Sequence, residues 1–394
     1  MTAANILICD LVGLKFDENG RPDFSEAKAH IEAKGGIFHD GGPDGTRPPV
    51  AGRLNFFYLP DLSTPEEILR ITADGRYDAV IAAATFIPEA ARFRLGGVRI
   101  GAGTGNMGSV SWGGGSGEGG EAPLMNTPGI NSRATAQMAF KALLRVRPDL
   151  PVTKLHALVA SGNFDTGRQL RDYPTEKLEG KRLAVAGFGN IGREFALLGR
   201  AFGMKVAVYA RAHHRARIEA DGFEYADTIE AAANGADVFS VHLGLGPFDR
   251  ESGRYANQGS IGETVFSVLN HGSVLINYDR GELVDVPALG KAMARGGVAH
   301  AAIDADLFKD ADTGALSGPM VPYLALVPQF GDRLELLPHA AADTDHPSRV
   351  AGARQAIDQI FDAILLKRVT NLKGSLPAGY TDMGKKNPLT DGVS

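Results

Sequence analysis

The sequence has 394 residues, 44% of them hydrophobic, and its 41 lysines and arginines against 46 aspartates and glutamates give a formal charge of −5. This length predicts two or three domains with self-sufficient cores. The acidic balance disfavours a nucleic-acid partner, because such binding needs basic side chains that neutralise phosphates. Cys9 is the single cysteine, which excludes an intrachain disulfide and a cysteine-based zinc site. We therefore expect a cytoplasmic protein with no bound metal.

The N-terminal third predicts a smaller α/β domain, with apolar runs typical of buried strands at 6–10, 79–83 and 98–102. The first run is interrupted by Asp10 and follows no basic segment, so we expect neither a signal peptide nor a membrane span there. Residues 113–120 are almost all glycine, which costs about 1 kcal/mol per helical position relative to alanine. We expect a disordered loop there, with closure over a substrate as the alternative.

From Arg182 onward, strand-like and helical segments alternate. Apolar runs lie at 183–186, 206–209, 237–241, 274–277 and 301–303, with helical periodicity at 193–202 and 215–221. Such an alternation predicts a parallel sheet covered on both faces, that is, a doubly wound α/β domain. Residues 346–368 predict a long amphipathic helix capped by Asp345 or Thr344, which should return the chain to another unit. Residues 373–394 lack periodicity and are predicted to be a tail.

The segment Gly187-Phe188-Gly189-Asn190-Ile191-Gly192 fits the G-x-G-x-x-G dinucleotide pattern. With 50 glycines, a chain of this length yields about one such match by chance, and 103–108 and 115–120 match as well. Only the match at 187 follows a predicted strand and opens a predicted helix, the setting that points backbone NH groups at a pyrophosphate. The alternative is an ordinary turn between a strand and a helix.

The end of the next predicted strand indicates which dinucleotide binds. A carboxylate about 20 residues after the glycines would bind the ribose of NAD and repel a 2′-phosphate. The chain has Ala210 there instead, followed by Arg211 and Arg215, whose guanidinium groups suit a phosphate. We predict a preference for NADP(H), with NAD(H) binding possible if the two arginines belong only to a solvated helix start.

Several stretches together resemble the D-isomer-specific 2-hydroxyacid dehydrogenases, a family that includes phosphoglycerate dehydrogenase and glyoxylate/hydroxypyruvate reductase. In the family's order they are AGTG at 102–105, NTPGINS at 126–132, the glycine motif at 187–192, INYDRGELVD at 276–285, AID at 302–304 and PHAAADT at 338–344. The resemblance implies two Rossmann-like doubly wound domains. A dinucleotide-binding domain at 132–340 would be inserted into a discontinuous substrate domain at 1–131 and 341–394.

Reduction of a 2-oxo acid by hydride transfer needs a cation for the carboxylate and carbonyl, and a proton donor for the developing alkoxide. Arg280, which follows a predicted strand, and His339, whose unperturbed pKa of about 6.5 suits reversible proton transfer, are the candidates. The alternatives are a surface arginine and a structural histidine. The resemblance implies that Asp304 holds the nicotinamide carboxamide. The other residues assigned with it are Asn190, Ile191 and His242 for the cofactor, and Thr104, Gly105 and Asn131 for the substrate.

The chain departs from the family pattern in two places. The family's Glu that pairs with the histidine is missing, and we predict Asp310, then Asp306, as its substitute, with surface roles as the alternative. The basic stretch of phosphoglycerate dehydrogenases is replaced by AAAT at 82–85, which favours a substrate without a second strong anion. The alternative is that Arg92 or Arg94 replaces the missing phosphate anchor. Tyr278 and Asp279 replace small residues before Arg280, and we expect them to narrow the cleft and add a negative charge.

We therefore predict an NAD(P)H-dependent reductase that converts a small 2-oxo acid to a D-2-hydroxy acid, or the reverse. One alternative is a dinucleotide-sensing binding protein of the same fold with little or no activity, and another is a dehydrogenase inactivated by the missing Glu. The resemblance implies a homodimer that pairs through the cofactor domains.

Overall fold

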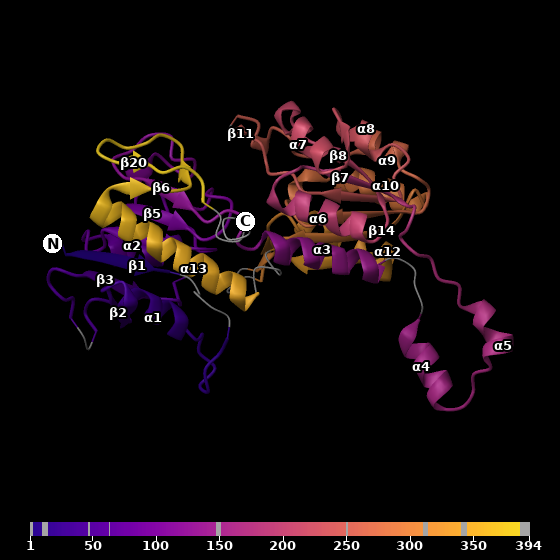
Figure 1. Ribbon diagram of the computed structural model, residues 1–394, viewed down its shortest axis with the longest axis horizontal. Coiled ribbons are helices and arrows are strands. Elements are labelled where there is room, and N and C mark those ends of the chain that lie inside the picture. The colour runs from indigo at the N-terminus through magenta and orange to yellow at the C-terminus, as the bar shows by residue number, and fades with distance from the viewer. Residues whose placement is uncertain are drawn as a thin grey trace. The chain divides into compact units, whose positions relative to one another are not determined.

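The computed structural model places the chain in two compact units, one formed by Met1–Ser132 with Asp343–Ser394 and the other by Arg133–Ala342 (Figure 1). The structure describes residues 3–9, 15–45, 48–62, 64–146, 151–249, 251–309, 314–339 and 345–386. Within these ranges, no helix is both long and apolar enough to cross a membrane. Each unit is built around one mainly parallel sheet, so the predicted doubly wound α/β fold is confirmed.

The first unit contains a seven-stranded sheet in the order β19-β6-β5-β4-β1-β3-β2. Its strands are β1 (Ala4–Ile8), β2 (Ile37–Asp40), β3 (Leu54–Tyr58), β4 (Ala79–Ala82), β5 (Gly96–Arg99), β6 (Leu124–Asn126) and β19 (Leu372–Lys373). All pair in parallel except β19, which runs antiparallel to β6. Helices α1 (Ser25–Ala33) and α13 (His346–Phe361) share one core on this sheet, while Ile68 of α2 (Pro65–Thr72) belongs to a second core.

The C-terminal helix α13 begins with Asp345 as its N-cap, whose carboxylate accepts a hydrogen bond from the Ser348 amide at 3.0 Å. The other candidate cap, Thr344, lies outside the described residues. A π-helical turn at Asp362–Leu366 ends the helical segment. The apolar side chains of α13 face the sheet, as the predicted amphipathic pattern requires.

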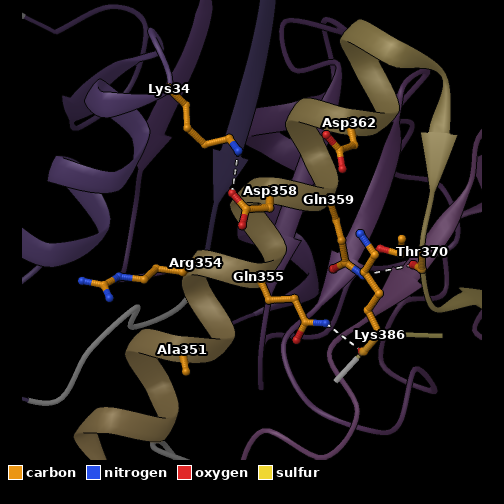
Figure 2. Close-up of a pocket in the computed structure, with 9 residues that line it drawn as sticks. All are labelled: Lys34, Ala351, Arg354, Gln355, Asp358, Gln359, Asp362, Thr370 and Lys386. Carbon is orange, nitrogen blue, oxygen red and sulfur yellow. Dashed lines mark hydrogen bonds and ion pairs between the residues drawn. The ribbon is translucent and has the colours of Figure 1, made fainter. Parts of the chain in front are cut away.

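The prediction of a tail at 373–394 is wrong for residues 373–386, the part of this segment that the structure describes. Two short strands, β18 (Arg368–Val369) and β20 (Thr381–Asp382), pair in parallel. A cavity of about 420 Å³ lies beside α13, and Figure 2 shows the side chains that line it. Here Gln355 Nε2 donates to the Lys386 carbonyl at 3.1 Å, and Gln359 Nε2 donates to the Thr370 carbonyl at 3.0 Å. The segment is therefore fixed to α13 by side-chain to main-chain hydrogen bonds.

The expectation that residues 113–120 form a disordered loop is also wrong. The amide of Gly114 donates to Ser109 O at 3.0 Å, and the Ser375 amide donates to Gly117 O at 2.8 Å. A Cβ on Gly117 would lie 2.2 Å from the Lys373 carbonyl oxygen. Glycine is thus required here by close main-chain packing, and not by a need for freedom of movement.

The second unit contains a seven-stranded parallel sheet in the order β17-β14-β13-β10-β7-β8-β9. Its strands are β7 (Arg182–Ala186), β8 (Lys205–Tyr209), β9 (Glu224–Ala226), β10 (Val238–Val241), β13 (Ser273–Asn277), β14 (Val298–Ala305) and β17 (Leu334–Pro338). Numbered from β7, the order is 3-2-1-4-5-6-7, which is the order of dinucleotide-binding folds extended by one strand. Successive strands are therefore added toward one edge from β7 to β9 and toward the opposite edge from β10 onward, so the strand order reverses between β7 and β10.

Helices cover both faces of this second sheet (Figure 1). One core includes α8 (Ile229–Ala233), α9 (Glu263–Val268) and α10 (Val286–Ala294), and the other includes α3 (Ser132–Val146), α6 (Asn190–Ala201) and α7 (Arg215–Ala220). Two further helices, α4 (Val152–Ala160) and α5 (Thr166–Gln169), contain no buried residue. Shorter helices, α11 (Val321–Leu324) and α12 (Val327–Phe330), precede β17.

Candidate active site

The parallel sheet of the second unit brings the predicted residues to one edge. Gly187 and His242 follow the adjacent strands β7 and β10, where Ala186 pairs with Val241. Arg280 follows β13, Asp304 lies at the end of β14, and His339 follows β17. Because the carboxyl ends of parallel strands meet at a common edge, the glycine motif and the charged residues lie along the same edge of this sheet.

The turn after β7 has the shape that a pyrophosphate requires. Gly187 has a φ of +105°, and a Cβ there would lie 2.1 Å from the His242 carbonyl oxygen. A Cβ on Gly192 would lie 2.1 Å from the Gly187 carbonyl oxygen, so the first turn of α6 packs directly on the strand end. A Cβ on Gly189 would meet no atom within 4 Å, and no side chain caps α6 in the described part of the chain. The open space at the helix N-terminus therefore fits an anionic phosphate.

The two other glycine matches have no such setting. Residues 103–108 form turns in which the Met107 amide donates to Thr104 O at 2.9 Å, and 115–120 belong to the packed loop of the first unit. Neither match opens an α-helix. The context of the pattern, and not the pattern itself, thus distinguishes the motif at 187.

The end of β8 has no carboxylate of the kind that would bind the ribose of NAD, as the sequence indicates. Ala210 is buried. Arg211 is exposed, and its guanidinium has no hydrogen-bond or ion-pair partner among the described residues, although its carbonyl accepts a hydrogen bond from the His214 amide at 2.9 Å. Arg215 donates to Glu219 at 2.8 Å and lies over the Tyr225 ring at 5.3 Å. Of the two predicted phosphate ligands, Arg211 is therefore the one that is not already engaged.

The side chain of His242 belongs to the core of the unit. Its Nε2 lies 2.8 Å from Ser240 Oγ, and its ring packs against Phe195 at 5.1 Å between centroids. Burial lowers the pKa of His242 to about 3, so the imidazole is neutral at physiological pH. The main chain of His242, and not its ring, borders the Gly187 turn.

His339 pairs with Asp304. The His339 Nδ1 lies 2.6 Å from Asp304 Oδ1, and the His339 amide donates to Ala305 O at 3.1 Å. Burial alone would lower the pKa of His339, but the hydrogen bond and negative charge of Asp304 outweigh burial and raise it. Asp304 therefore favours the protonated form of the imidazole and fixes the orientation of its ring.

Asp304 thus occupies the position for which the sequence suggested Asp310 or Asp306. Asp310 lies outside the described residues. Asp306 acts on His339 only through its charge, which also raises the histidine pKa. The pairing follows from strand register, because Asp304 lies opposite Leu337, two residues before His339.

Two side chains fix the main chain at Arg280 by hydrogen bonds to backbone carbonyls. Asn277 Nδ2 donates to the Arg280 carbonyl at 2.9 Å, and Tyr323 OH donates to the next carbonyl, that of Gly281, at 2.6 Å. The Arg280 guanidinium has no hydrogen-bond or ion-pair partner in the described ranges. A fixed backbone and an unengaged fork of donors suit a carboxylate ligand.

The expectation that Tyr278 narrows the cleft is wrong. Tyr278 is 1% exposed and packs in the core that includes α3. Its hydroxyl donates to Glu335 Oε1 at 3.2 Å, and Arg145 Nε donates to the other carboxylate oxygen at 2.6 Å. Of the two unusual residues before Arg280, Asp279 is the one on which Arg280, Asp304 and His339 all act electrostatically.

The predicted substrate residues Thr104, Gly105 and Asn131 belong to the first unit. Thr104 is 8% exposed, whereas a Cβ on Gly105 would meet no atom within 4 Å. Asn131 lines a small cavity with Gly101. The first two lie in the loop that follows β5, at the carboxyl end of that strand.

Comparisons with known proteins agree with this architecture. Residues 151–313 match the model of the D-isomer specific 2-hydroxyacid dehydrogenase NAD binding domain. A glyoxylate reductase of Thermococcus litoralis is 34% identical over 184 residues, covering 46% of this chain and 52% of the relative. A D-3-phosphoglycerate dehydrogenase of Methanocaldococcus jannaschii is 26% identical over 251 residues, covering 63% of this chain and 43% of the relative. The chain spans about half the length of the curated relatives it matches.

Among solved structures, a glyoxylate reductase from Paecilomyes thermophila has a TM-score of 0.63 at 20% identity, covering 94% of this chain and 98% of that one. This structural likeness concerns the fold. It extends over both units, whereas the family model matches part of the second unit alone.

Proposed function

We propose that this chain is a member of the D-isomer-specific 2-hydroxyacid dehydrogenase family, and that it reduces a small 2-oxo acid to a D-2-hydroxy acid or catalyses the reverse reaction. The observation that carries the proposal is the cluster of Arg280, Asp304 and His339 at the sheet edge that also contains the Gly187 turn. A bound nicotinamide dinucleotide would supply or accept the hydride.

The proposed reaction assigns substrate binding, proton donation and orientation of the proton donor to different residues of the chain. Arg280 binds the substrate carboxylate through its forked donors and polarises the neighbouring carbonyl. His339 donates a proton to the oxygen that gains negative charge during reduction and recovers it in the reverse direction. Asp304 keeps His339 protonated and oriented. In the first unit, we propose that Thr104, Gly105 and Asn131 bind the substrate, with Thr104 and Gly105 donating backbone NH groups.

We propose NADP(H) as the preferred cofactor. The glycine turn binds the pyrophosphate, and Arg211 binds the 2′-phosphate, because Ala210 leaves no carboxylate to repel it. A structural neighbour at 18% identity, from Sinorhizobium meliloti, is described as an NADPH-dependent glyoxylate/hydroxypyruvate reductase in complex with NADP and malonate. Arg215 contributes less than Arg211 because it already binds Glu219.

We also propose that two copies of the chain associate through the second unit. Helices α4 and α5 bury none of their own residues, and Val152, Val159 and the nearby Leu170 are 67%, 60% and 50% exposed. Exposed apolar side chains clustered along one segment are typical of an interaction surface. Light scattering should give a molar mass twice that of the chain, and a monomer would contradict the proposal.

A substrate panel tests the proposed reaction. Loss of the absorbance of reduced nicotinamide is followed with glyoxylate, hydroxypyruvate, phenylpyruvate and branched 2-oxo acids, each with NADH and with NADPH. We expect turnover of small monoanionic 2-oxo acids with a lower KM for NADPH. Tight NADPH binding without turnover of any substrate would instead indicate a dinucleotide sensor.

Arg211→Ala tests the cofactor preference. Loss of a charge-assisted contact to the 2′-phosphate should raise the KM for NADPH about tenfold and leave the KM for NADH unchanged. Arg217→Ala is the matched control, because it removes an exposed arginine from α7, the helix that follows. An unchanged NADPH KM in Arg211→Ala would refute the assignment.

A further inference from the structure

Asp279 is a charged residue of the site to which the proposed reaction assigns no role. It lies between Asn277, the last residue of β13, and Arg280, and its amide donates to Asn277 Oδ1 at 3.3 Å. The adjacent strand β14 ends with Asp304 opposite Leu337 of β17, and Asn277 lies opposite Ile303. This register places Asp279, Arg280, Asp304 and His339 in one cluster at the carboxyl edge.

The Asp279 carboxylate has no hydrogen-bond donor and no ion-pair partner among the described residues. The groups that act on it electrostatically are Arg280 on its own loop, Asp304 on β14 and His339 after β17. Burial raises the pKa of Asp279 to about 7, while Arg280 and His339 act in the opposite direction and Asp304 adds to the rise. The charge of this residue therefore changes within the physiological pH range.

We propose that Asp279 is a specificity-determining residue that makes the site discriminate against 2-oxo acids with a second negative charge. The inference rests on the proposed reaction, since it assumes that the substrate carboxylate binds Arg280. A monoanionic substrate places its single charge on the guanidinium. A dianionic substrate adds a second carboxylate close to Asp279, and like charges brought together in a shared site weaken binding.

The discrimination should increase with pH. When Asp279 is protonated, it is neutral and places no charge beside the second carboxylate. When it ionises, it repels that carboxylate within about 8 Å, a distance over which physiological salt screens charges only in part. Neither substrate carboxylate titrates in this range, so a change in selectivity with pH originates in the protein.

Two substrates of equal chain length separate this effect from the chemistry. The monoanion 2-oxovalerate and the dianion 2-oxoglutarate both have five carbons and the same reacting 2-oxo acid group. The measured quantity is the ratio of kcat/KM for 2-oxovalerate to kcat/KM for 2-oxoglutarate, with the same reduced cofactor. The role of His339 as proton donor is the same in both reactions, so it cancels in this ratio. The positive charge of His339 also attracts the second carboxylate, and the neutral variants at position 279 measure that contribution.

In the unmodified protein, the ratio should rise about tenfold between about pH 6 and about pH 8.5. In Asp279→Asn, which keeps the size of the side chain and removes its titration, the ratio should be lower and should rise with pH clearly less than in the unmodified protein, because only His339 still titrates beside the second carboxylate. Asp279→Ser is a second neutral variant with the same expected outcome. Asp332→Asn is the matched control, because it removes an exposed carboxylate at the amino end of β17, the opposite edge of the sheet. Its ratio should follow that of the unmodified protein.

A pH-independent ratio in the unmodified protein overturns the inference, and so does a rise of the same size in both neutral variants. These outcomes leave the proposed reaction standing, because they presuppose turnover. Absence of turnover with 2-oxovalerate, 2-oxoglutarate and the whole substrate panel overturns the proposed reaction and the inference together.

Discussion

The carboxyl edge of the second sheet has two regions that bind by different physical means. Beside β7 and β8, the chain offers main-chain NH groups and open space, and the critical residues, Gly187, Gly189 and Gly192, have no side chain. Beside β13, β14 and β17, it offers ionisable side chains whose protonation depends on one another.

The difference indicates which kind of substitution should abolish the function of each region. The glycine region depends on volume, because an added methyl group either fills the phosphate space or forces main-chain atoms apart. The charged region depends on proton and charge balance, so isosteric changes that preserve volume should still abolish its action. Substitutions that change only one of these properties test the distinction.

The largest effect is expected in the charged region. In His339→Gln, kcat for 2-oxo acid reduction should fall about 10³-fold, because the side chain keeps a polar group but cannot donate a proton. Binding of NADPH, followed by fluorescence, should remain within about twofold of the unmodified protein, since the glycine region is untouched. Retained turnover in this variant would show that another group donates the proton.

The second effect is a shift in pH dependence. Reduction requires protonated His339, so kcat/KM should fall as pH rises through the histidine pKa. Asp304→Asn removes the charge that raises this pKa and leaves burial, which lowers it, so the fall should begin at a lower pH than in the unmodified protein. The measurement is the pH profile of kcat/KM.

Asp306→Asn is the control for this shift, because Asp306 raises the same pKa through charge without a hydrogen bond. Its profile should move less than that of Asp304→Asn. An unchanged profile in Asp304→Asn, combined with a higher KM for NADPH, would instead assign Asp304 to the nicotinamide carboxamide.

The two regions also differ in how far the sequence predicts them. The glycine region depends on local context, a strand before Gly187 and a helix after Gly192, and both are visible in the hydrophobic pattern. The Asp304–His339 pair depends on the register of β14 and β17, which are joined by a long connection, and periodicity contains no information about register. A spacing rule therefore suggested Asp310 and Asp306 instead.

The packed loop at 113–120 illustrates the same limit in the first unit. Its glycine content predicts freedom of movement when only neighbouring residues are considered. The structure places Lys373 and Ser375, more than two hundred residues later, against Gly117. Close packing between distant segments uses glycine for its small size, and the composition of the loop is the same in either case.

The smallest expected effects lie within the glycine region, where two matched substitutions separate binding from folding. In Gly189→Ala, the new methyl group meets no protein atom within 4 Å, so thermal stability should stay unchanged while the dissociation constant for NADPH rises about tenfold. In Gly192→Ala, the same methyl group would lie 2.1 Å from the Gly187 carbonyl oxygen, so the midpoint of thermal unfolding should fall by several degrees even without cofactor. Equal loss of stability in both variants would mean that the space at Gly189 is needed for folding and not for a phosphate.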